Sequence, residues 1–210
     1  MTPRLLLRLV QLLAGSILGF AAVLWWLGHK APAPHSEGVI GESYFLAVPL
    51  QSPPFTLTSH LGERWSSRES HEKILAVFFG YTFCPDICPL TLSRLTEAFR
   101  LMGENGDQIQ LLLISVDPAR DTPEQLAGYM SNFHPSFLGL TGTLEEIREV
   151  ADGFGAYFSA NGSGENYTVD HTARTFIVDP DGRIPLTFPV TATPGEIARD
   201  LATLIEASRR

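Results

Sequence analysis

The sequence predicts an α/β domain, in which strands and helices alternate around one central sheet. Two apolar runs support this prediction, at Ile74–Phe79 and Ile109–Val116, and a further strand is expected at Thr172–Val178. The first is a continuous run of β-branched and aromatic residues, which is typical of a strand buried on both faces. Leucines at helical spacing follow it, as in Leu92 and Leu95. The chain has 210 residues, which suits one such domain and an appendage.

Local signals predict the remaining elements in chain order. The expected strands are Phe55–Thr58, Glu63–Ser66, Ile74–Phe79, Ile109–Val116, Phe137–Leu140, Thr172–Val178 and Arg183–Pro189. The expected helices are Leu90–Leu101, Pro123–Phe133, a helix opening at Thr143 and ending near Phe154, and Pro194–Ser208. Pro89 and Pro123 stand where a helix takes its first residue, and Thr122 is the expected N-cap. Tyr157–Asp170 is glycine-rich and is expected to be a long flexible excursion. The expected elements form a hairpin, then strand–helix–strand–helix, then a second hairpin and a last helix. This order predicts a thioredoxin-like fold.

The N-terminal segment is expected to be a transmembrane helix. Arg4 and Arg8 precede an uncharged run from Leu9 to Gly28 that ends near Trp25-Trp26, and about 20 apolar residues suffice to cross a bilayer. The arginines place the N-terminus in the cytoplasm. The expected organisation is a cytoplasmic segment 1–8, an anchor 9–28, a flexible tether 29–48 and a domain 49–210. A cleaved signal peptide is the alternative, but the apolar run is longer than a usual signal core.

This topology favours a bacterial inner membrane with the C-terminal domain in the periplasm, since no Arg/Ser-rich import sequence precedes the run. The net charge of −8 and the scattered basic residues argue against nucleic acid as a partner. The chain has no phosphate-binding loop and no glycine-rich dinucleotide turn after a strand.

The two cysteines, Cys84 and Cys88, are expected on a turn between the central strand and a helix. Thiolates are favoured near the positive end of a helix, so thiol pKa values fall there. A thioredoxin-type redox pair has two intervening residues, whereas three lie between these cysteines. Two thiolates form a soft ligand pair that favours Cu(I) or Zn²⁺ over Mg²⁺, Ca²⁺ or Mn²⁺.

His171 is the candidate third ligand, because it closes the excursion and precedes a core strand expected beside the cysteine turn. Its position fits a ligand and a loop histidine that hydrogen-bonds the turn equally well. Asp86 and Asp170 are candidates for hydrogen-bonding the ligand side chains without binding the metal themselves. Asp86 fits an ordinary turn residue nearly as well. Asp117, Arg120 and Asp121 fit either a partner surface or a salt-bridged loop. The other histidines and the methionines are expected to be spectators or core residues.

The sequence resembles the Sco/SenC family of copper-binding proteins, which serve the assembly of cytochrome c oxidase. The matching runs, in the family's order, are Phe79–Pro89 with Cys84-Pro85-Asp86-Ile87-Cys88, Ile114–Glu124, Phe133–Phe137, Gly139–Thr143 and Val169–Thr172. The sequence departs from the family at Ser52–Phe55, at Ser59-His60 and at Phe83, where the family often has histidine. None of these departures removes a candidate ligand.

The resemblance implies that Cys84, Cys88 and His171 bind one copper ion, Cu(I) or Cu(II). It implies a thioredoxin-like fold and a single N-terminal anchor. It also implies a metallochaperone rather than an enzyme, which delivers copper to the binuclear site of cytochrome c oxidase subunit II and has other copper chaperones as possible partners.

Three alternatives stay open. The first is a membrane-anchored thiol–disulfide oxidoreductase that uses Cys84 and Cys88 to reduce the cysteines of that binuclear site. The second is a peroxide-reducing enzyme on the same fold; such chemistry needs Thr, Pro and Arg around the attacking thiol, and the sequence contains Thr82 and Arg174. The third is a structural disulfide, which would close only a small loop and stabilise little.

Overall fold

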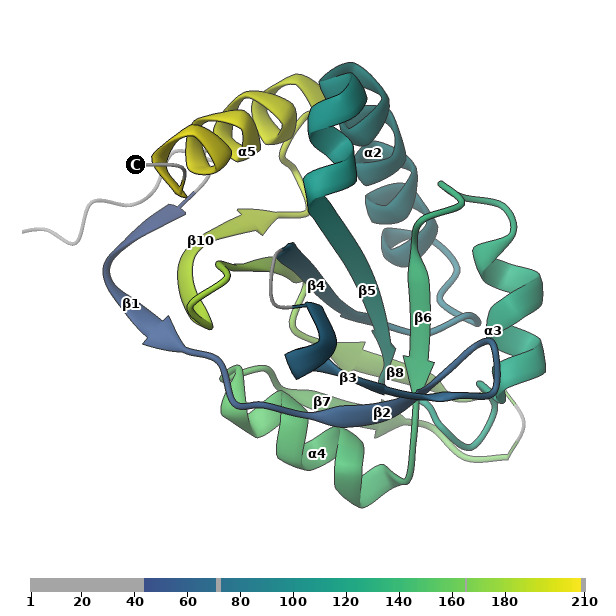
Figure 1. The fold of residues 1–210 in the computed structure, drawn as a ribbon. Coiled ribbons are helices and arrows are strands. Elements are labelled where there is room, and N and C mark those ends of the chain that lie inside the picture. The colour runs from purple at the N-terminus through teal and green to yellow at the C-terminus, as the bar shows by residue number, and fades with distance from the viewer. Residues whose placement is uncertain (1–43, 71–72, 165, 209–210) are drawn as a thin grey trace, which may run out of the picture. The chain divides into compact units, whose positions relative to one another are not determined.

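An eight-stranded mixed sheet forms the centre of the protein (Figure 1). The computed structural model describes residues 44–70, 73–164 and 166–208. The strand order is β1-β10-β9-β4-β5-β6-β2-β3. The strands are β1 Tyr44–Gln51, β2 Thr56–Ser59, β3 Arg64–Ser66, β4 Ile74–Gly80, β5 Ile109–Ser115, β6 Leu138–Thr141, β9 Arg174–Val178 and β10 Arg183–Pro189.

The three strands β4, β5 and β6 run parallel at the middle of the sheet, and the strands on both sides are antiparallel to their neighbours. All seven residues of β4 are buried. This burial confirms the prediction of a strand covered on both faces, because only such a strand can be apolar throughout.

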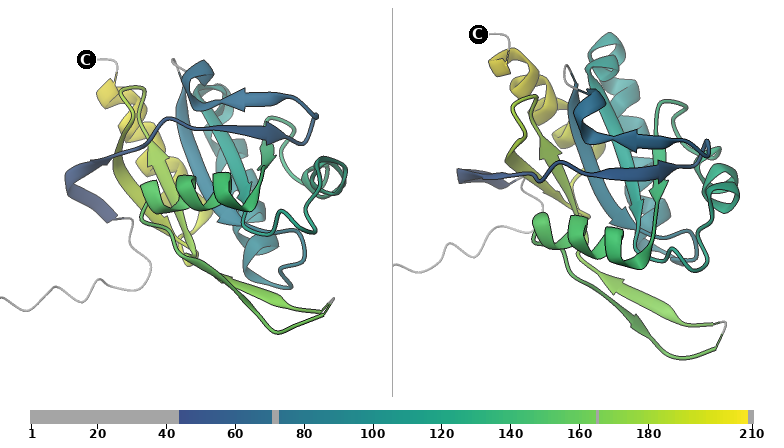
Figure 2. Two further views of the ribbon diagram at one scale, coloured as in Figure 1. Left: turned by 90° about the horizontal axis from the view of Figure 1, so that it is seen from below. Right: turned by 60° about the horizontal axis from the view of Figure 1, so that its bottom comes forward.

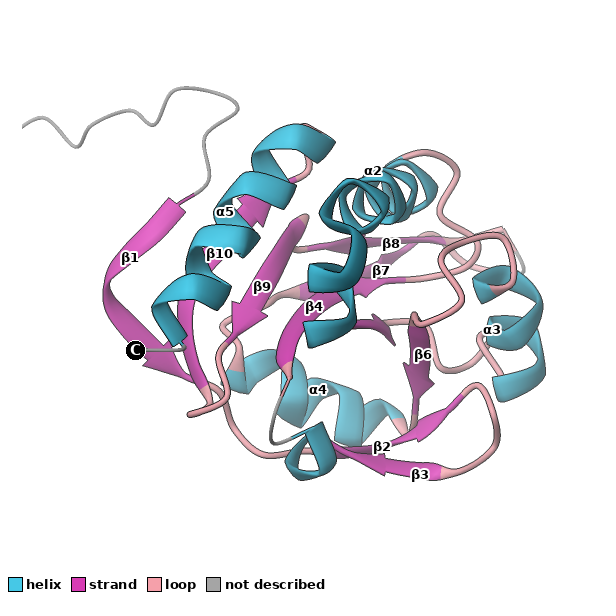
Figure 3. Cartoon of the chain, turned by 45° about the horizontal axis from the view of Figure 1, so that its top comes forward, coloured by secondary structure: helices cyan, strands magenta, loops and turns pink. Residues whose placement is uncertain are grey.

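Helices cover the two faces of the sheet. They are α2 Ile87–Met102, α3 Pro123–Met130, α4 Leu144–Gly153 and α5 Pro194–Ser208, with 3₁₀ turns η1 Ser67–Ser70 and η2 Gly103–Gln108. Helices α2 and α5 lie side by side on one face, and α4 lies on the other (Figures 1 and 3). The α4 helix begins with a complete capping box between Thr143 and Glu146, which satisfies two backbone N–H groups at its start.

Aromatic rings fill the core on the side of α4. Phe79 and Phe176 project from neighbouring regions of the sheet onto Phe154, with ring centroids 5.5–6.0 Å apart and edge-on geometry. Phe55 meets the same ring at 6.1 Å. Edge-to-face packing of this kind adds to the free energy gained from burying the rings.

The predicted elements are present, with the thioredoxin-like arrangement of a mixed sheet between helices. Strand β10 and helix α5 have the predicted limits. Helix α2 begins at Ile87, earlier than predicted, so Cys88 lies inside the helix and Pro89 is not its first residue. The proline is still tolerated, because the first turn of a helix has no intrahelical partners for its N–H groups.

Two other segments differ from the sequence analysis. Residues 44–48, assigned there to the tether, form part of strand β1, which pairs with β10. The expected excursion forms a separate two-stranded sheet of β7 Phe158–Asn161 and β8 Thr168–His171. Figure 2 shows this hairpin projecting beyond the main sheet.

The predicted anchor, residues 9–28, lies outside the described residues. In the ranges that the structure describes, no helix combines the length and the apolar character needed to cross a bilayer.

Candidate metal centre

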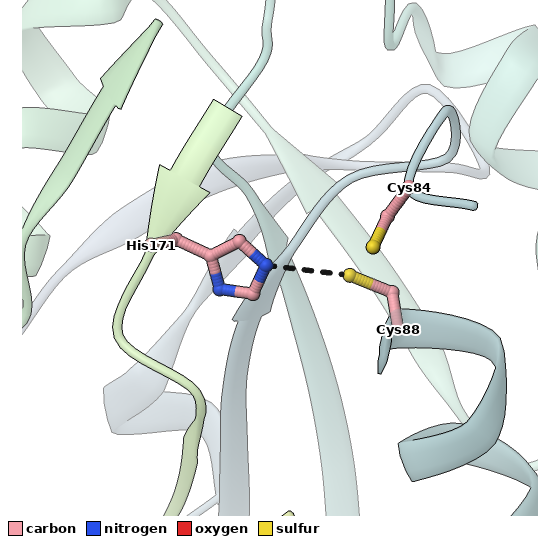
Figure 4. A group of neighbouring side chains, drawn as sticks. All are labelled: Cys84, Cys88 and His171. Carbon is pink, nitrogen blue, oxygen red and sulfur yellow. Dashed lines mark hydrogen bonds between the residues drawn. The ribbon is translucent and has the colours of Figure 1, made fainter. Parts of the chain in front are cut away.

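Three side chains from distant parts of the chain converge at one end of the central strands. Cys84 lies in the loop after β4, Cys88 in the first turn of α2, and His171 at the end of β8 (Figure 4). Their sulfur and nitrogen atoms all lie within 4.8 Å of one another, and Cys88 Sγ is 3.5 Å from His171 Nε2. This is the one such group with a His or Cys member among the described residues.

The spacing of these three atoms fits a metal ion. Ligand bonds of about 2.0–2.3 Å to a first-row ion place three donors around it roughly 3.5–4 Å apart. The observed separations therefore require a contraction of about 1 Å or less at the widest pair. Two sulfurs and one imidazole form a donor set that favours Cu(I) or Zn²⁺ over hard cations.

The imidazole of His171 is held in one orientation. Its Nδ1 lies 3.3 Å from the carbonyl oxygen of Thr172. A carbonyl only accepts, so Nδ1 carries the proton in the neutral ring and Nε2 presents its lone pair toward Cys88. The rings of Phe78 and Tyr81 each meet the imidazole edge-on, with centroids 6.0 Å away. The site therefore presents the nitrogen that a metal would need.

Tyr81 also anchors the strand that carries His171. Its hydroxyl oxygen accepts a hydrogen bond of 3.2 Å from the backbone N–H of Val169, which is buried. Burial raises the pKa of Tyr81 above its ordinary value. The hydroxyl therefore stays protonated near neutral pH and bridges the cysteine loop to β8.

The two thiols share one proton. A hydrogen bond from Cys88 lowers the pKa of Cys84 to about 3, and the backbone N–H of Asp86 acts in the same direction. The same hydrogen bond and burial raise the pKa of Cys88 far above its ordinary value. Loss of the first proton leaves a thiolate at Cys84, which is half-buried, while Cys88 is buried completely.

Glycine is needed at the end of β4. A Cβ atom on Gly80 would lie 3.0 Å from Cys88 Sγ and 3.0 Å from the Phe78 ring. The sulfur can sit against the strand only because this position carries no side chain. The close approach of α2 to β4 thus depends on Gly80.

A cluster around Arg120 closes the other side of the loop. Its guanidinium pairs with Asp117 at 2.5 Å and donates to the carbonyl oxygen of Tyr167 at 3.0 Å. It stacks on the ring of Tyr167, at 3.7 Å, and lies 4.6 Å from the ring of Phe83. The expected salt bridge thus forms between Asp117 and Arg120, and Arg120 connects Phe83, before Cys84, to Tyr167, before β8.

Asp86 is exposed, and its side chain makes no capping bond to α2. Asp170 is exposed on the opposite face of β8 from His171 and accepts a hydrogen bond from Asn161. His60 accepts from the backbone N–H of Gly139, and His134 bonds Ser136. His29, His35 and His71 lie outside the described residues, and Met102 and Met130 pack in the core.

Sequence reasoning missed three residues that lie against the ligand side chains, namely Phe78, Gly80 and Tyr81. Each comes from a strand end or a loop where ordinary packing explains the residue type equally well. A Gly-Tyr pair directly before the cysteine turn was the available signal, because a glycine ending a buried strand often marks a close approach.

Comparison with known proteins identifies the family. The SCO1/SenC model matches residues 47–206. The chain belongs to the SCO1/SenC family. It is 37% identical to the human mitochondrial SCO1 homologue, over 79% of this chain and 56% of the human protein. It is 36% identical to an SCO2-like protein of Rickettsia prowazekii, over 69% of this chain and 72% of that protein.

A solved structure of another family member contains copper. ScoI of Bradyrhizobium japonicum with copper bound superposes with a TM-score of 0.68 at 38% identity, covering 73% of this chain and 98% of that one. The aligned region of this chain thus spans nearly all of that structure, but little more than half the length of the human relative.

Proposed function

We propose that this protein binds one copper ion through Cys84, Cys88 and His171 and serves the assembly of cytochrome c oxidase. The convergence of these three donors within 4.8 Å is the observation that carries the proposal. The donor set is one that Cu(I) prefers. The relationship to copper-bound ScoI supports copper over zinc.

We further propose that the protein delivers this copper to the binuclear site of oxidase subunit II by ligand exchange. Three protein donors leave a copper ion open to a fourth ligand from a partner. Cys84 is the accessible sulfur, so an incoming thiolate would approach from its side, while the buried Cys88 would be the last ligand to leave. His171 stands on a hairpin that projects from the main sheet (Figure 2), and a shift of this hairpin would withdraw the imidazole first.

A copper competition titration tests the binding site. His171→Ala is expected to weaken copper binding by more than the roughly 10–100-fold that loss of an outer-shell partner costs, because it removes a direct ligand. The control is His134→Ala, which removes an imidazole that bonds only Ser136 among the described residues and should leave the affinity unchanged. Equal affinities of His171→Ala and the wild type would remove His171 from the site.

A second function, thiol–disulfide exchange, is favoured by the low pKa of Cys84. Its thiolate would attack a partner disulfide and form a mixed disulfide. Attack by Cys88 would then release the partner as a dithiol and leave a Cys84–Cys88 disulfide, so two electrons pass to the partner. An oxidase-assembly assay separates the functions: loss in both the cysteine and the His171 variants supports copper, and loss in the cysteine variants alone supports exchange.

We also propose the membrane topology that the sequence indicates, with residues 9–28 as an uncleaved anchor and the domain in the bacterial periplasm. Arg4 and Arg8 before the apolar run support this orientation. Two reporter enzymes fused after the C-terminus test this topology. A reporter that is active only in the periplasm is expected to be active, and a reporter that is active only in the cytoplasm is expected to be inactive. Activity of a cytoplasm-dependent reporter would contradict the topology.

A further inference from the structure

A buried carboxyl group lies beneath the loop that carries Cys84. Asp121 has an exposed fraction of 0%. Its Oδ2 accepts hydrogen bonds from the backbone N–H of Thr82 at 3.0 Å and from the hydroxyl of Ser115 at 2.6 Å. Its Oδ1 accepts from the hydroxyl of Thr82 at 2.6 Å. This carboxyl therefore ties the cysteine loop to the end of β5.

The hydrogen-bond pattern around Asp121 suits an ionised carboxylate, because all three of its partners can donate. The Thr82 hydroxyl already accepts from Gln125 Nε2 at 3.2 Å, and the Ser115 hydroxyl accepts from the backbone N–H of Asp117 at 3.1 Å. Each hydroxyl can therefore donate its own proton to the carboxylate while it accepts a hydrogen bond from another group. Burial raises the pKa of Asp121 above its ordinary value, and the hydrogen bonds from Ser115 and Thr82 oppose that rise.

The charge of Asp121 is not paired, since the ion pairs among the described residues do not include it. The two residues that donate hydrogen bonds to Asp121, Thr82 and Ser115, both lie near the cysteines. Thr82 is the second residue before Cys84, and Ser115 pairs in register with Gly80, where a Cβ would lie 3.0 Å from Cys88 Sγ.

We propose that Asp121 is a positioning residue that also sets the oxidation state of copper favoured at the site. The inference rests on the proposed copper function. Two thiolates and Cu(I) carry a net charge of −1, whereas two thiolates and Cu(II) are neutral. A fixed carboxylate nearby repels the first arrangement and not the second, so Asp121 stabilises Cu(II) relative to Cu(I).

Asp121→Asn is a suitable variant, because the site can accommodate the amide. In the wild type the Thr82 N–H and the Ser115 hydroxyl both donate to Oδ2, and the amide oxygen of the variant can accept from both. The amide nitrogen can donate to the Thr82 hydroxyl oxygen, which has a second lone pair. The substitution therefore removes the charge and keeps a hydrogen bond to each anchor.

The experiment measures the affinities of the full-length protein for Cu(I) and for Cu(II) separately, by competition with chelators of each ion. In Asp121→Asn the ratio of Cu(I) to Cu(II) affinity is expected to rise roughly tenfold, which equals about 59 mV in the copper reduction potential. Thr82→Val keeps the charge and is expected to weaken both affinities alike without changing their ratio. Asp152→Asn removes an exposed charge on α4 and is the matched control.

An unchanged ratio in folded Asp121→Asn would overturn the inference and leave copper binding by the wild type intact. An equal shift in Asp152→Asn would overturn it as well. Carboxyl ¹³C NMR of the metal-free wild type provides a test without any variant: an ionised Asp121 at neutral pH is expected, and a protonated one would refute the charge argument. Failure of the wild type to bind copper at all would instead refute the proposed function.

Discussion

Replacement of Tyr81 by phenylalanine isolates the link between the cysteine loop and the strand that carries His171. The ring stays, so the edge-on contact with the imidazole is retained. The hydroxyl that accepts the Val169 N–H is lost, and this donor is buried. An unsatisfied buried donor costs about 1–3 kcal/mol of stability. For a chain of 150–250 residues each kcal/mol corresponds to about 2–4 °C in Tm.

Urea unfolding of the metal-free protein measures this cost, and a copper competition titration measures the effect on the site. Copper affinity is expected to fall as well, because β8 loses a contact that positions His171. Tyr157→Phe is the control, since that side chain is 66% exposed and surface changes usually stay within about 0.5 kcal/mol. A Tyr81→Phe protein with wild-type stability and wild-type copper affinity would refute the argument that this hydroxyl anchors the strand.

Three further predictions concern stability. Gly80→Ala is expected to lower the free energy of unfolding in urea by about 1–3 kcal/mol and to weaken copper binding, because its Cβ would crowd Cys88 Sγ at 3.0 Å. Gly128→Ala is the control: its Cβ would meet no atom within 4 Å, so it should raise the free energy of unfolding by about 0.5–1 kcal/mol. Thr143→Ala should lose about 0.5–2 kcal/mol from the α4 cap with copper affinity unchanged, and an effect on copper would contradict the separation of α4 from the site. Burial raises the pKa of Asp121, so folding favours its protonated form, and the wild type should lose stability relative to Asp121→Asn as pH rises from about 3.9 through the folded pKa. A stability difference that stays constant across that range would show that Asp121 does not titrate differently in the folded state.

Much of the fold follows from patterns that are local in the sequence. The apolar run of β4 and the Thr122-Pro123 start of α3 depend on neighbouring residues alone. Thr122 is the N-cap of α3 as expected, and its side chain accepts a hydrogen bond from the backbone N–H of Gln125. Strand β1 was not recognised, because its pairing partner β10 lies far away in the sequence and its own apolar side chains remain largely exposed. Helix α2 begins earlier than the Pro89 signal indicated, and the packing of Cys88 against Gly80 is a tertiary contact without a local signal.

The metal centre shows the same division. The spacing of Cys84 and Cys88 is visible in the sequence, whereas their meeting with His171 depends on how β8 returns to the sheet. Position alone left His171 undecided between a ligand and an ordinary loop histidine, and only the resemblance to a family favoured the ligand. The support from Asp121 was equally hidden, since a buried carboxylate and an exposed loop acid are indistinguishable before their neighbours are known.

The central claim is that two sulfurs and one imidazole hold the same ion. X-ray absorption at the copper edge of the Cu(I)-loaded protein tests it most directly, with the wild type and His171→Ala measured side by side. The account predicts two sulfur ligands and one nitrogen ligand in the wild type, with loss of the nitrogen and retention of both sulfurs in the variant. A wild-type ion bound by only one sulfur, or the same nitrogen ligand in His171→Ala, would contradict it.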